Sequence, residues 1–163
     1  MPEYVKDSLI RFQNTLRKLT DQPHKHTIPV FSTTIQYSKA ADMSRKINND
    51  KKKFIQQVTG NFLNYARAVD PTILVALSTI ASIQAAPIEA TMEEAKYFLD
   101  YAASHPDTIL SYIASDMILA AHIDASYLAE PKASSRAGRH FFMSNNAENP
   151  ANNGAVLTIA QII

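Results

Sequence analysis

The sequence predicts an α+β fold in which helices precede an antiparallel sheet. Two observations predict it. Apolar residues recur at helical spacing up to about His105, whereas from Ile109 onward they occur in short runs rich in β-branched and aromatic residues. Of the 163 residues, 46% are hydrophobic and 19% are charged, so the chain can bury a core. We therefore expect a helical region over residues 1–106 and a strand region over residues 107–163.

The first helix is expected over Tyr4–Leu19, because apolar residues recur there at helical spacing. Pro23 and Pro29 then break regular structure, and we expect the polar stretch 21–50 to be an extended connection. The apolar residues expected to hold this connection on a neighbouring core are Ile28, Val30, Phe31, Ile35 and Tyr37.

A second helix is expected over Phe54–Val69. Gly60 lies inside it and costs about 1 kcal/mol relative to alanine, so its presence indicates close backbone packing. Asp70 and Pro71 predict a helix restart, because an aspartate caps a helix and a proline suits the first helical position. The helix that follows, Thr72–Gln84, is apolar almost all round and is expected to be buried on most sides.

The last helix is expected to end before His105-Pro106, and a capping-box pattern at Thr91–Glu94 opens or reinforces it. A tight turn at Ser115-Asp116 and an Asn/Pro/Gly loop over residues 145–154 then separate expected strands. One of these strands carries apolar residues on both faces, as a buried strand does. It is the second of the four expected strands, Ile109–Ile113, Met117–Asp124, Arg139–Ser144 and Ala155–Ile163.

Composition excludes several classes of protein. The net charge of +1 gives no overall attraction for nucleic acid or an anionic membrane. The absence of cysteine excludes disulfides and thiolate zinc sites, and it fits an intracellular protein of the cytoplasm or nucleus. No apolar run approaches the roughly 18 residues of a membrane span, and the N-terminus lacks the apolar segment of a secretion signal. We therefore expect no membrane partner.

The strand region carries the most specific motif. The run His122–Pro131, followed by Ser135–Phe142, resembles the start of the ribonuclease H domain in the polyprotein of copia-type retrotransposons. The resemblance implies that Asp124 matches the first of several carboxylates that hold catalytic Mg²⁺ in that family, with the others beyond Ile163. Two residues depart from the motif and fit a copy no longer selected for activity. They are Ile123, where a small polar residue is usual, and Arg139, where glycine is common.

The helical region resembles the same polyprotein, so the resemblance covers nearly the whole chain. The opening Met1–Val5, with Arg11-Phe12, resembles the segment that leads from the polymerase palm into the thumb. The residues that follow the order of the family's thumb and connection region are Gly60, Tyr65, Asp70-Pro71, Pro87 and Glu94–Tyr101.

The resemblance implies a helical thumb/connection-like part followed by an incomplete antiparallel ribonuclease-H-like sheet. In-line phosphoryl transfer needs two metals held about 4 Å apart by several carboxylates. The Tyr-x-Asp-Asp motif of the polymerase and most ribonuclease H carboxylates are absent from these residues. We therefore expect a polyprotein fragment that is not an enzyme as it stands and holds no cofactor. The parent family performs RNA-directed DNA synthesis and degrades RNA–DNA hybrids with Mg²⁺.

Two alternatives to an inactive fragment remain open. One is an element-derived module that its host retains to bind nucleic acid or another protein. The other is a ribonuclease H that a second polypeptide completes. The resemblance also implies that the helices which cover the sheet of a complete domain lie outside these residues. We expect a marginally stable chain that exposes apolar sheet surface and self-associates or aggregates through it.

Asp124 is the candidate metal ligand, as the remnant first carboxylate of a ribonuclease H site at the end of a central strand. The alternative is an ordinary aspartate at a strand end, and one carboxylate binds Mg²⁺ weakly. His122 lies on the same strand face and His140 on the next expected strand, which suggests a His/Asp/His metal cluster. Isolated histidines on a half-buried sheet are the favoured interpretation, because the sequence does not fix the register between the two strands. The loop residues His24 and His26 are expected to be solvated.

The densest positive cluster comprises Arg45, Lys46, Lys51, Lys52 and Lys53. Lysines before a helix can contact the phosphate backbone of an RNA–DNA or DNA duplex, independently of base sequence and dependent on salt. A solvated face at the start of a helix is the favoured interpretation. Because cations are unfavourable at the positive end of a helix dipole, their presence there supports the binding interpretation.

Overall fold

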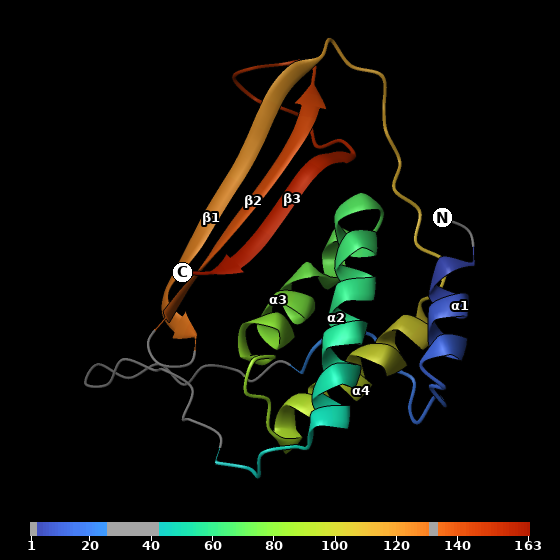
Figure 1. The fold of residues 1–163 in the computed structure, drawn as a ribbon. Coiled ribbons are helices and arrows are strands. Elements are labelled where there is room, and N and C mark those ends of the chain that lie inside the picture. Colours follow the sequence, from blue (N-terminus) through green and yellow to red (C-terminus); the bar gives the residue numbers. More distant parts are fainter. Residues whose placement is uncertain (1–2, 26–42, 131–133) are drawn as a thin grey trace.

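A computed structural model gives the structure of the chain and describes residues 3–25, 43–130 and 134–163 (Figure 1). Helices precede a three-stranded sheet in these residues, so the predicted α+β class is confirmed. The elements are α1 (Tyr4–Arg11), α2 (Asn49–Ala68), the 3₁₀ turn η1 (Pro71–Ile73), α3 (Leu74–Ile83), α4 (Glu89–Ser104), β1 (Ile118–Glu130), β2 (Ser134–Ser144) and β3 (Ala155–Ile162). The residues named above that lie outside the described ranges are Met1, His26, Ile28, Pro29, Val30, Phe31, Ile35, Tyr37 and Pro131.

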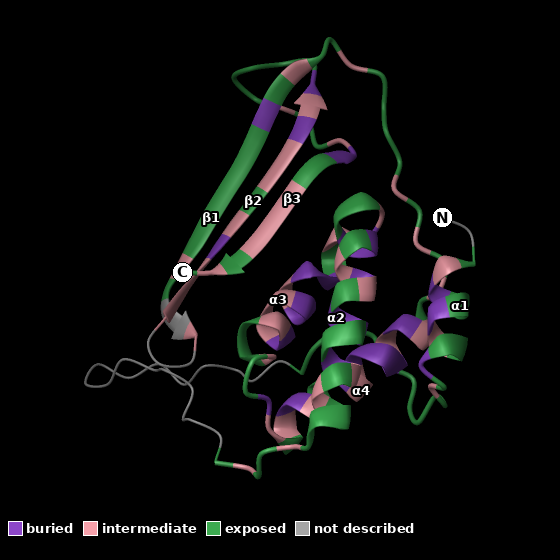
Figure 2. Ribbon diagram, in the orientation of Figure 1, coloured by how far each residue is buried: buried purple, intermediate pink, exposed green. Residues whose placement is uncertain are grey.

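The core lies between the helices, and Figure 2 shows their buried inner faces. Phe62 of α2 and Phe98 of α4 are fully buried and meet edge to face, with ring centroids 5.0 Å apart. Leu77 of α3 is buried in the same cluster. The expected helices over Phe54–Val69 and Thr72–Gln84 are therefore present, and they are held together by packing of their apolar faces.

Helix α1 ends at Arg11, so the expected helix through Leu19 is too long. The backbone of Gln13 is left-handed, with a φ of 50°. Its N–H donates to the carbonyl of Ile10 at 3.0 Å, and the N–H of Asn14 donates to that of Leu9 at 3.0 Å. These two bonds form a Schellman motif, which terminates a helix. Side-chain periodicity alone could not reveal this stop.

The predicted restart at Asp70-Pro71 is confirmed. The carboxylate of Asp70 accepts a hydrogen bond from the backbone of Thr72 at 3.2 Å, and Pro71 occupies the first helical position. The capping-box prediction is correct in part. Helix α4 begins before Thr91, whose hydroxyl lies in the first turn and accepts from the N–H of Ile88 at 3.3 Å. Thr91 therefore reinforces the helix start and does not open the helix.

The strands form an antiparallel meander in the order β1-β2-β3. In the described sheet the central strand is therefore β2, and β1 is an edge strand (Figure 1). Most residues of Met117–Asp124 are exposed (Figure 2), and they include the apolar Leu119 and Ile123, as expected of a sheet that lacks part of its cover. The strand also continues to Glu130, and it starts at Ile118 because Met117 has a left-handed φ of 60°.

The strand expected over Ile109–Ile113 does not form, and the hairpin turn expected at Ser115-Asp116 is lost with it. The side chain of Asn153 replaces a partner strand here. Its Oδ1 accepts from the N–H of Ile113 at 2.7 Å, and its Nδ2 donates to the carbonyl of the same residue at 2.7 Å. The hydroxyl of Tyr112 donates to the carbonyl of Ala155 at 2.9 Å. The segment thus attaches to the sheet through the loop over residues 145–154.

Arg136 joins the sheet to the helices. From β2 its guanidinium donates to the hydroxyls of Ser78 and Thr79 on α3, the latter at 2.8 Å. It also donates to Glu130 at 2.6 Å, and the side chains of this ion pair are only 12% and 15% exposed. Ala160 of β3 packs against the helical core beside this contact. One face of the sheet is therefore fixed to α3 by both polar and apolar contacts.

Replacement of Arg136 by methionine should destabilise the chain. The change keeps most of the apolar stem but leaves the half-buried Glu130 carboxylate without its cation, at a cost of about 1–3 kcal/mol. Urea unfolding followed by circular dichroism measures this loss of stability. The matched control is Arg139→Met on the same strand, which should change stability by less than about 0.5 kcal/mol because Arg139 is exposed. Equal losses in the two variants would contradict the role given to Arg136.

Two glycines should respond oppositely to alanine. No atom lies within 4 Å of a Cβ built on Gly60, so the close packing expected at this position is wrong. Gly60→Ala should stabilise helix α2 by up to about 1 kcal/mol. A Cβ on Gly154 would lie 2.5 Å from the carbonyl oxygen of Ser111 and 2.7 Å from the Tyr112 ring. Gly154→Ala should therefore lower the melting temperature, and a rise in that variant would contradict the packing described.

Candidate functional site

The three residues considered for a metal cluster lie at one open hollow. It has a volume of about 370 Å³ and lies between the sheet and the start of α3. Strand pairing explains the arrangement, because His122 is directly opposite His140 and Asp124 is directly opposite Gly138. Opposite residues share one face of a sheet. The residues that line the hollow are Pro71, Leu74, Val75, His122, Ile123, Asp124, Gly138, Arg139, His140, Thr158, Ile159 and Ala160.

Asp124 lies in the middle of β1, so its expected place at the end of a central strand is wrong. The residue is exposed, and its Oδ1 accepts a hydrogen bond from the N–H of Ala125 at 2.8 Å. Over residues 3–25, 43–130 and 134–163 no group of three histidines or carboxylates could hold a metal ion. Within those ranges Asp124 therefore lacks the further carboxylates that a two-metal site needs.

The two strand histidines have partners other than a metal. The Nε2 of His122 lies 2.9 Å from the amide oxygen of Asn152, and the Nδ1 of His140 lies 3.2 Å from the Thr158 hydroxyl. Both imidazoles also lie against the ring of Phe142, with centroid distances of 5.0 and 5.4 Å. Phe142 is fully buried. Both imidazoles thus lie over the apolar surface of the sheet, which is the place of isolated histidines on a half-buried sheet.

The structure brings the five predicted basic residues to one end of the molecule. Residues 44–48 run antiparallel to residues 87–90, with a bridge between Lys46 and Ile88. The N–H of Glu89 donates to the carbonyl of Arg45 at 2.9 Å. Asn48 then caps α2 by accepting from the N–H of Lys51 at 3.0 Å. We call the cations of this region the basic end; it comprises Arg45, Lys46, Lys51, Lys52 and Lys53.

Four cations of the basic end are exposed, and Lys52 is engaged. The Lys52 ammonium donates to the carbonyl of Ala85 at 2.6 Å, just past the carboxyl end of α3. A cation is favourable at that negative end of a helix dipole. Among residues 43–53 and 87–90 the carboxylates are Asp50 and Glu89, so positive charge prevails there. An exposed surface of this kind can hold phosphate oxygens.

Sequence reasoning missed an ion-pair network that fixes the segment after α1. The Asp100 carboxylate, with its side chain 3% exposed, accepts from the Arg17 guanidinium at 3.0 Å. Arg17 also pairs with Glu93 at 3.0 Å. Partial burial acts to lower the pKa of Arg17, but its hydrogen bonds to Glu93 and Asp100 outweigh burial and raise it. Hydrogen bonds from Lys96 and then Arg17 lower the pKa of Glu93. The spacing of these residues gave no signal, because Arg17 and Asp100 are distant in the chain.

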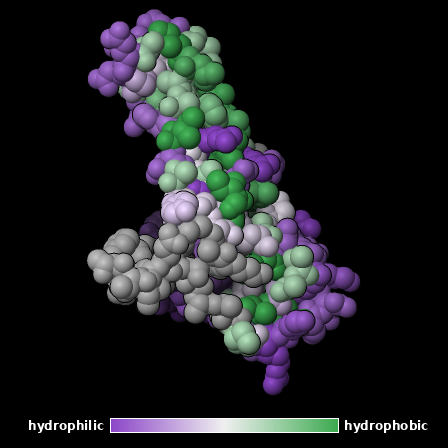
Figure 3. All heavy atoms as spheres, turned by 90° about the vertical axis from the view of Figure 1, so that its left-hand side faces the viewer, coloured by the Kyte–Doolittle hydropathy of each residue, from purple (hydrophilic) through white to green (hydrophobic). Residues whose placement is uncertain are grey.

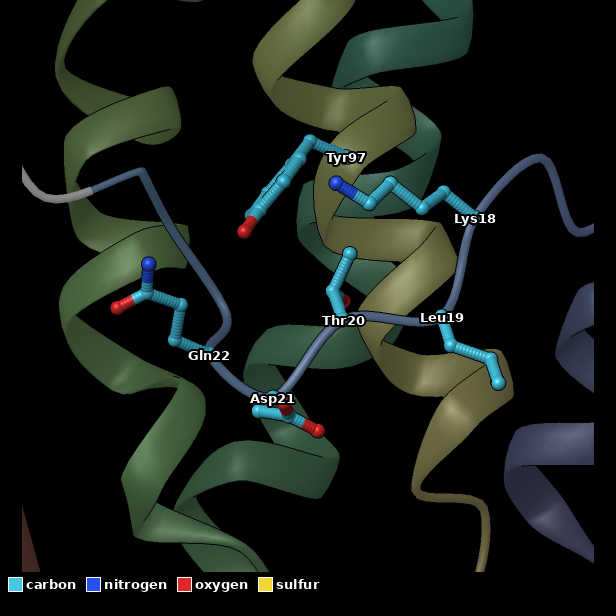
Figure 4. Close-up of a pocket in the computed structure, with 6 residues that line it drawn as sticks. All are labelled: Lys18, Leu19, Thr20, Asp21, Gln22 and Tyr97. Atoms are coloured by element: carbon cyan, nitrogen blue, oxygen red, sulfur yellow. The ribbon is translucent and has the colours of Figure 1, made fainter.

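A second hollow, of about 340 Å³, lies between residues 18–22 and helix α4 (Figure 4). Figure 4 shows the side chains of Lys18 and Tyr97 on one side of it and that of Asp21 on the other. Thr20 is buried there, with its carbonyl 3.0 Å from Nε2 of His105. The charged groups that line this second hollow are the Lys18 ammonium and the Asp21 carboxylate, which point away from each other. They are therefore not placed to act together in acid–base catalysis.

No protein-family model, curated protein or solved structure matches this chain. In the described part of the chain, none of the helices has the length and apolar character needed to cross a membrane.

From the described residues we predict that Mg²⁺ changes the melting temperature of this chain little. A lone exposed carboxylate leaves the ion with most of its waters, so millimolar MgCl₂ should not raise the melting temperature, and Asp124→Asn should change it little. Differential scanning fluorimetry on both proteins, with CaCl₂ as the ionic control, measures this. A rise with MgCl₂ that Asp124→Asn removes would show that Asp124 has further ligands.

Proposed function

We propose that these residues belong to a copia-type retrotransposon polyprotein, between its polymerase and ribonuclease H centres, and that they bind nucleic acid without catalysis. Three features support the proposal. The His122–Phe142 motif resembles the start of that ribonuclease H domain. Helices precede an antiparallel meander, which is the order of a thumb and connection followed by a ribonuclease-H-like sheet. The chain also presents a basic end beside the start of α2.

The basic end is the observation that carries the binding role. Its exposed cations lie at and just before the start of α2, while Lys52 holds that start against Ala85, just past the end of α3. Cations held on a rigid element contact phosphates with less loss of side-chain freedom than cations on a disordered tail. Such contacts release counterions, and they position a duplex without reading its bases.

A binding role is also more consistent with the hollow around Asp124 than catalysis is. Phosphoryl transfer needs metals held by several carboxylates, and Asp124 is the single carboxylate among the residues lining that hollow. One ring nitrogen of each imidazole beside it already has a partner, Asn152 for His122 and Thr158 for His140. In this proposal the sheet contributes structure, and the basic end contributes affinity.

Charge reversal tests the proposal. Lys51→Glu with Lys53→Glu should weaken binding of a fluorescein-labelled RNA–DNA duplex at least roughly tenfold at low salt, because two attractive contacts become repulsive. It should also reduce the slope of log affinity against log salt by about two. Fluorescence anisotropy measures both quantities.

The matched control is Arg67→Glu with Arg139→Glu, which changes the net charge equally. Arg67 is exposed in the last turn of the same helix, and Arg139 is exposed on β2. If both double variants lose affinity equally, binding follows net charge and the basic end has no special role. If neither weakens binding, or the parent chain does not bind, the proposed function is wrong.

A further inference from the structure

Strand β1 has an unprotected edge. It is 13 residues long, and among the described residues it pairs with β2 alone. Natural edge strands are blunted by lysine, proline or bulges. Between Ile118 and Glu130 the sequence contains no lysine, arginine, proline or glycine. The pairing of β1 with β2 is irregular only after Ser126, so the regular edge runs from Ile118 to Ser126. Figure 3, which looks onto the β1 side of the molecule, shows apolar residues gathered along its upper part. The edge is therefore a template for another strand.

We propose that a second copy of this chain pairs antiparallel with this edge, about a two-fold axis at Ile123. Each β1 would then continue the sheet of the other copy, giving six strands. The inference goes beyond nucleic-acid binding and does not rest on it, because it uses β1 and leaves the basic end free.

The apolar side chains of β1 match one another in this register. Ile123 lies opposite Ile123 of the second copy, and Leu119 lies opposite Tyr127 of the second copy. These three side chains are 68%, 63% and 78% exposed in one chain. Leu119 and Ile123 lie on the same face of the strand, because side chains alternate, and Tyr127 follows directly after the regularly paired part of β1, which ends at Ser126. Aromatic–aliphatic and β-branched pairs are favourable cross-strand neighbours.

On the opposite face of β1, a histidine of each copy meets a carboxylate of the other. Two-fold symmetry places His122 of each copy opposite Asp124 of the other, so the pair forms twice. Only Nε2 of His122 is engaged, with Asn152 at 2.9 Å, which leaves Nδ1 for the carboxylate. Asp124 now accepts from its neighbour Ala125, and it would turn outward to the imidazole. The residues once considered for a metal thus become contacts between copies.

Neighbouring registers are less favourable. A two-fold axis at Asp124 would place two carboxylates opposite each other, which is destabilising. An axis at His122 would oppose two imidazoles and would place Ile123 opposite the small Ala121 of the second copy. A shift by one residue would turn the apolar side chains to the other face. Charge and size together therefore select the register centred on Ile123.

Cysteine cross-linking tests the register, because the chain contains no cysteine. Opposite residues of antiparallel strands have Cα atoms about 4.5–5.5 Å apart, within the range of a disulfide. Ile123→Cys should form a disulfide-linked dimer on mild oxidation, visible on a non-reducing gel. The first control, Leu119→Cys, should not, because symmetry separates its two copies by eight residues at about 3.3 Å each, or about 26 Å. The second, Val156→Cys, is 54% exposed on β3 and measures random collision.

A charge swap tests the pairing without a covalent bond. His122→Asp should weaken self-association in sedimentation equilibrium at least roughly tenfold, because two carboxylates then face each other. Adding Asp124→His should restore it. The double variant carries the same His122 substitution, so its recovery also shows that this substitution leaves the fold intact.

Three results would overturn the proposal. A chain that stays monomeric at every concentration has no such interface. Cross-linking of Leu119→Cys or Val156→Cys as fast as Ile123→Cys would mean unspecific aggregation. Failure of the double variant to recover would exclude the His122–Asp124 contact. Each result is independent of duplex binding, which the variants at Lys51 and Lys53 measure separately.

Discussion

In the described part of the chain, the sheet packs one face on the helices, and this packing determines which residues of the sheet are exposed. Strands β2 and β3 meet α3 through the Arg136 contacts and the small side chain of Ala160. The guanidinium satisfies two helix hydroxyls and a carboxylate at once, so the polar groups at this junction are compensated. Strand β1 lies one strand further from α3, and its apolar side chains remain exposed. The free edge and the open hollow both follow from this arrangement.

The candidate functions occupy separate places. The basic end lies at the start of α2, and the loop over residues 145–154 lies at the opposite end of the molecule (Figure 1). The hollow around Asp124 lies between them, at the junction of sheet and α3. A duplex held by the basic end would therefore leave β1 accessible. Contacts to nucleic acid and contacts between copies can act together without competing for the same side chains.

Asp124 illustrates how context changes the chemistry of one residue. The motif around it resembles one in which the matching carboxylate is one of several metal ligands. In the described structure it lies opposite Gly138, beside the facing pair of His122 and His140, each of which has one ring nitrogen engaged. A carboxylate on an exposed edge, with a histidine two residues before it, is suited to pair with a copy of its own strand.

The sequence by itself determined the α+β class, the helices around Phe62 and Leu77, the restart at Asp70-Pro71 and the loop before β3, because these follow from local periodicity, caps and turn residues. It did not reveal the stop of α1 at Arg11, which depends on the left-handed backbone of Gln13. Only the tertiary structure decided that β1 is an edge strand, that Asn153 replaces a strand beside Ile113, and that Arg136 holds the sheet to α3. These features depend on register and on contacts between distant residues, which no local pattern encodes.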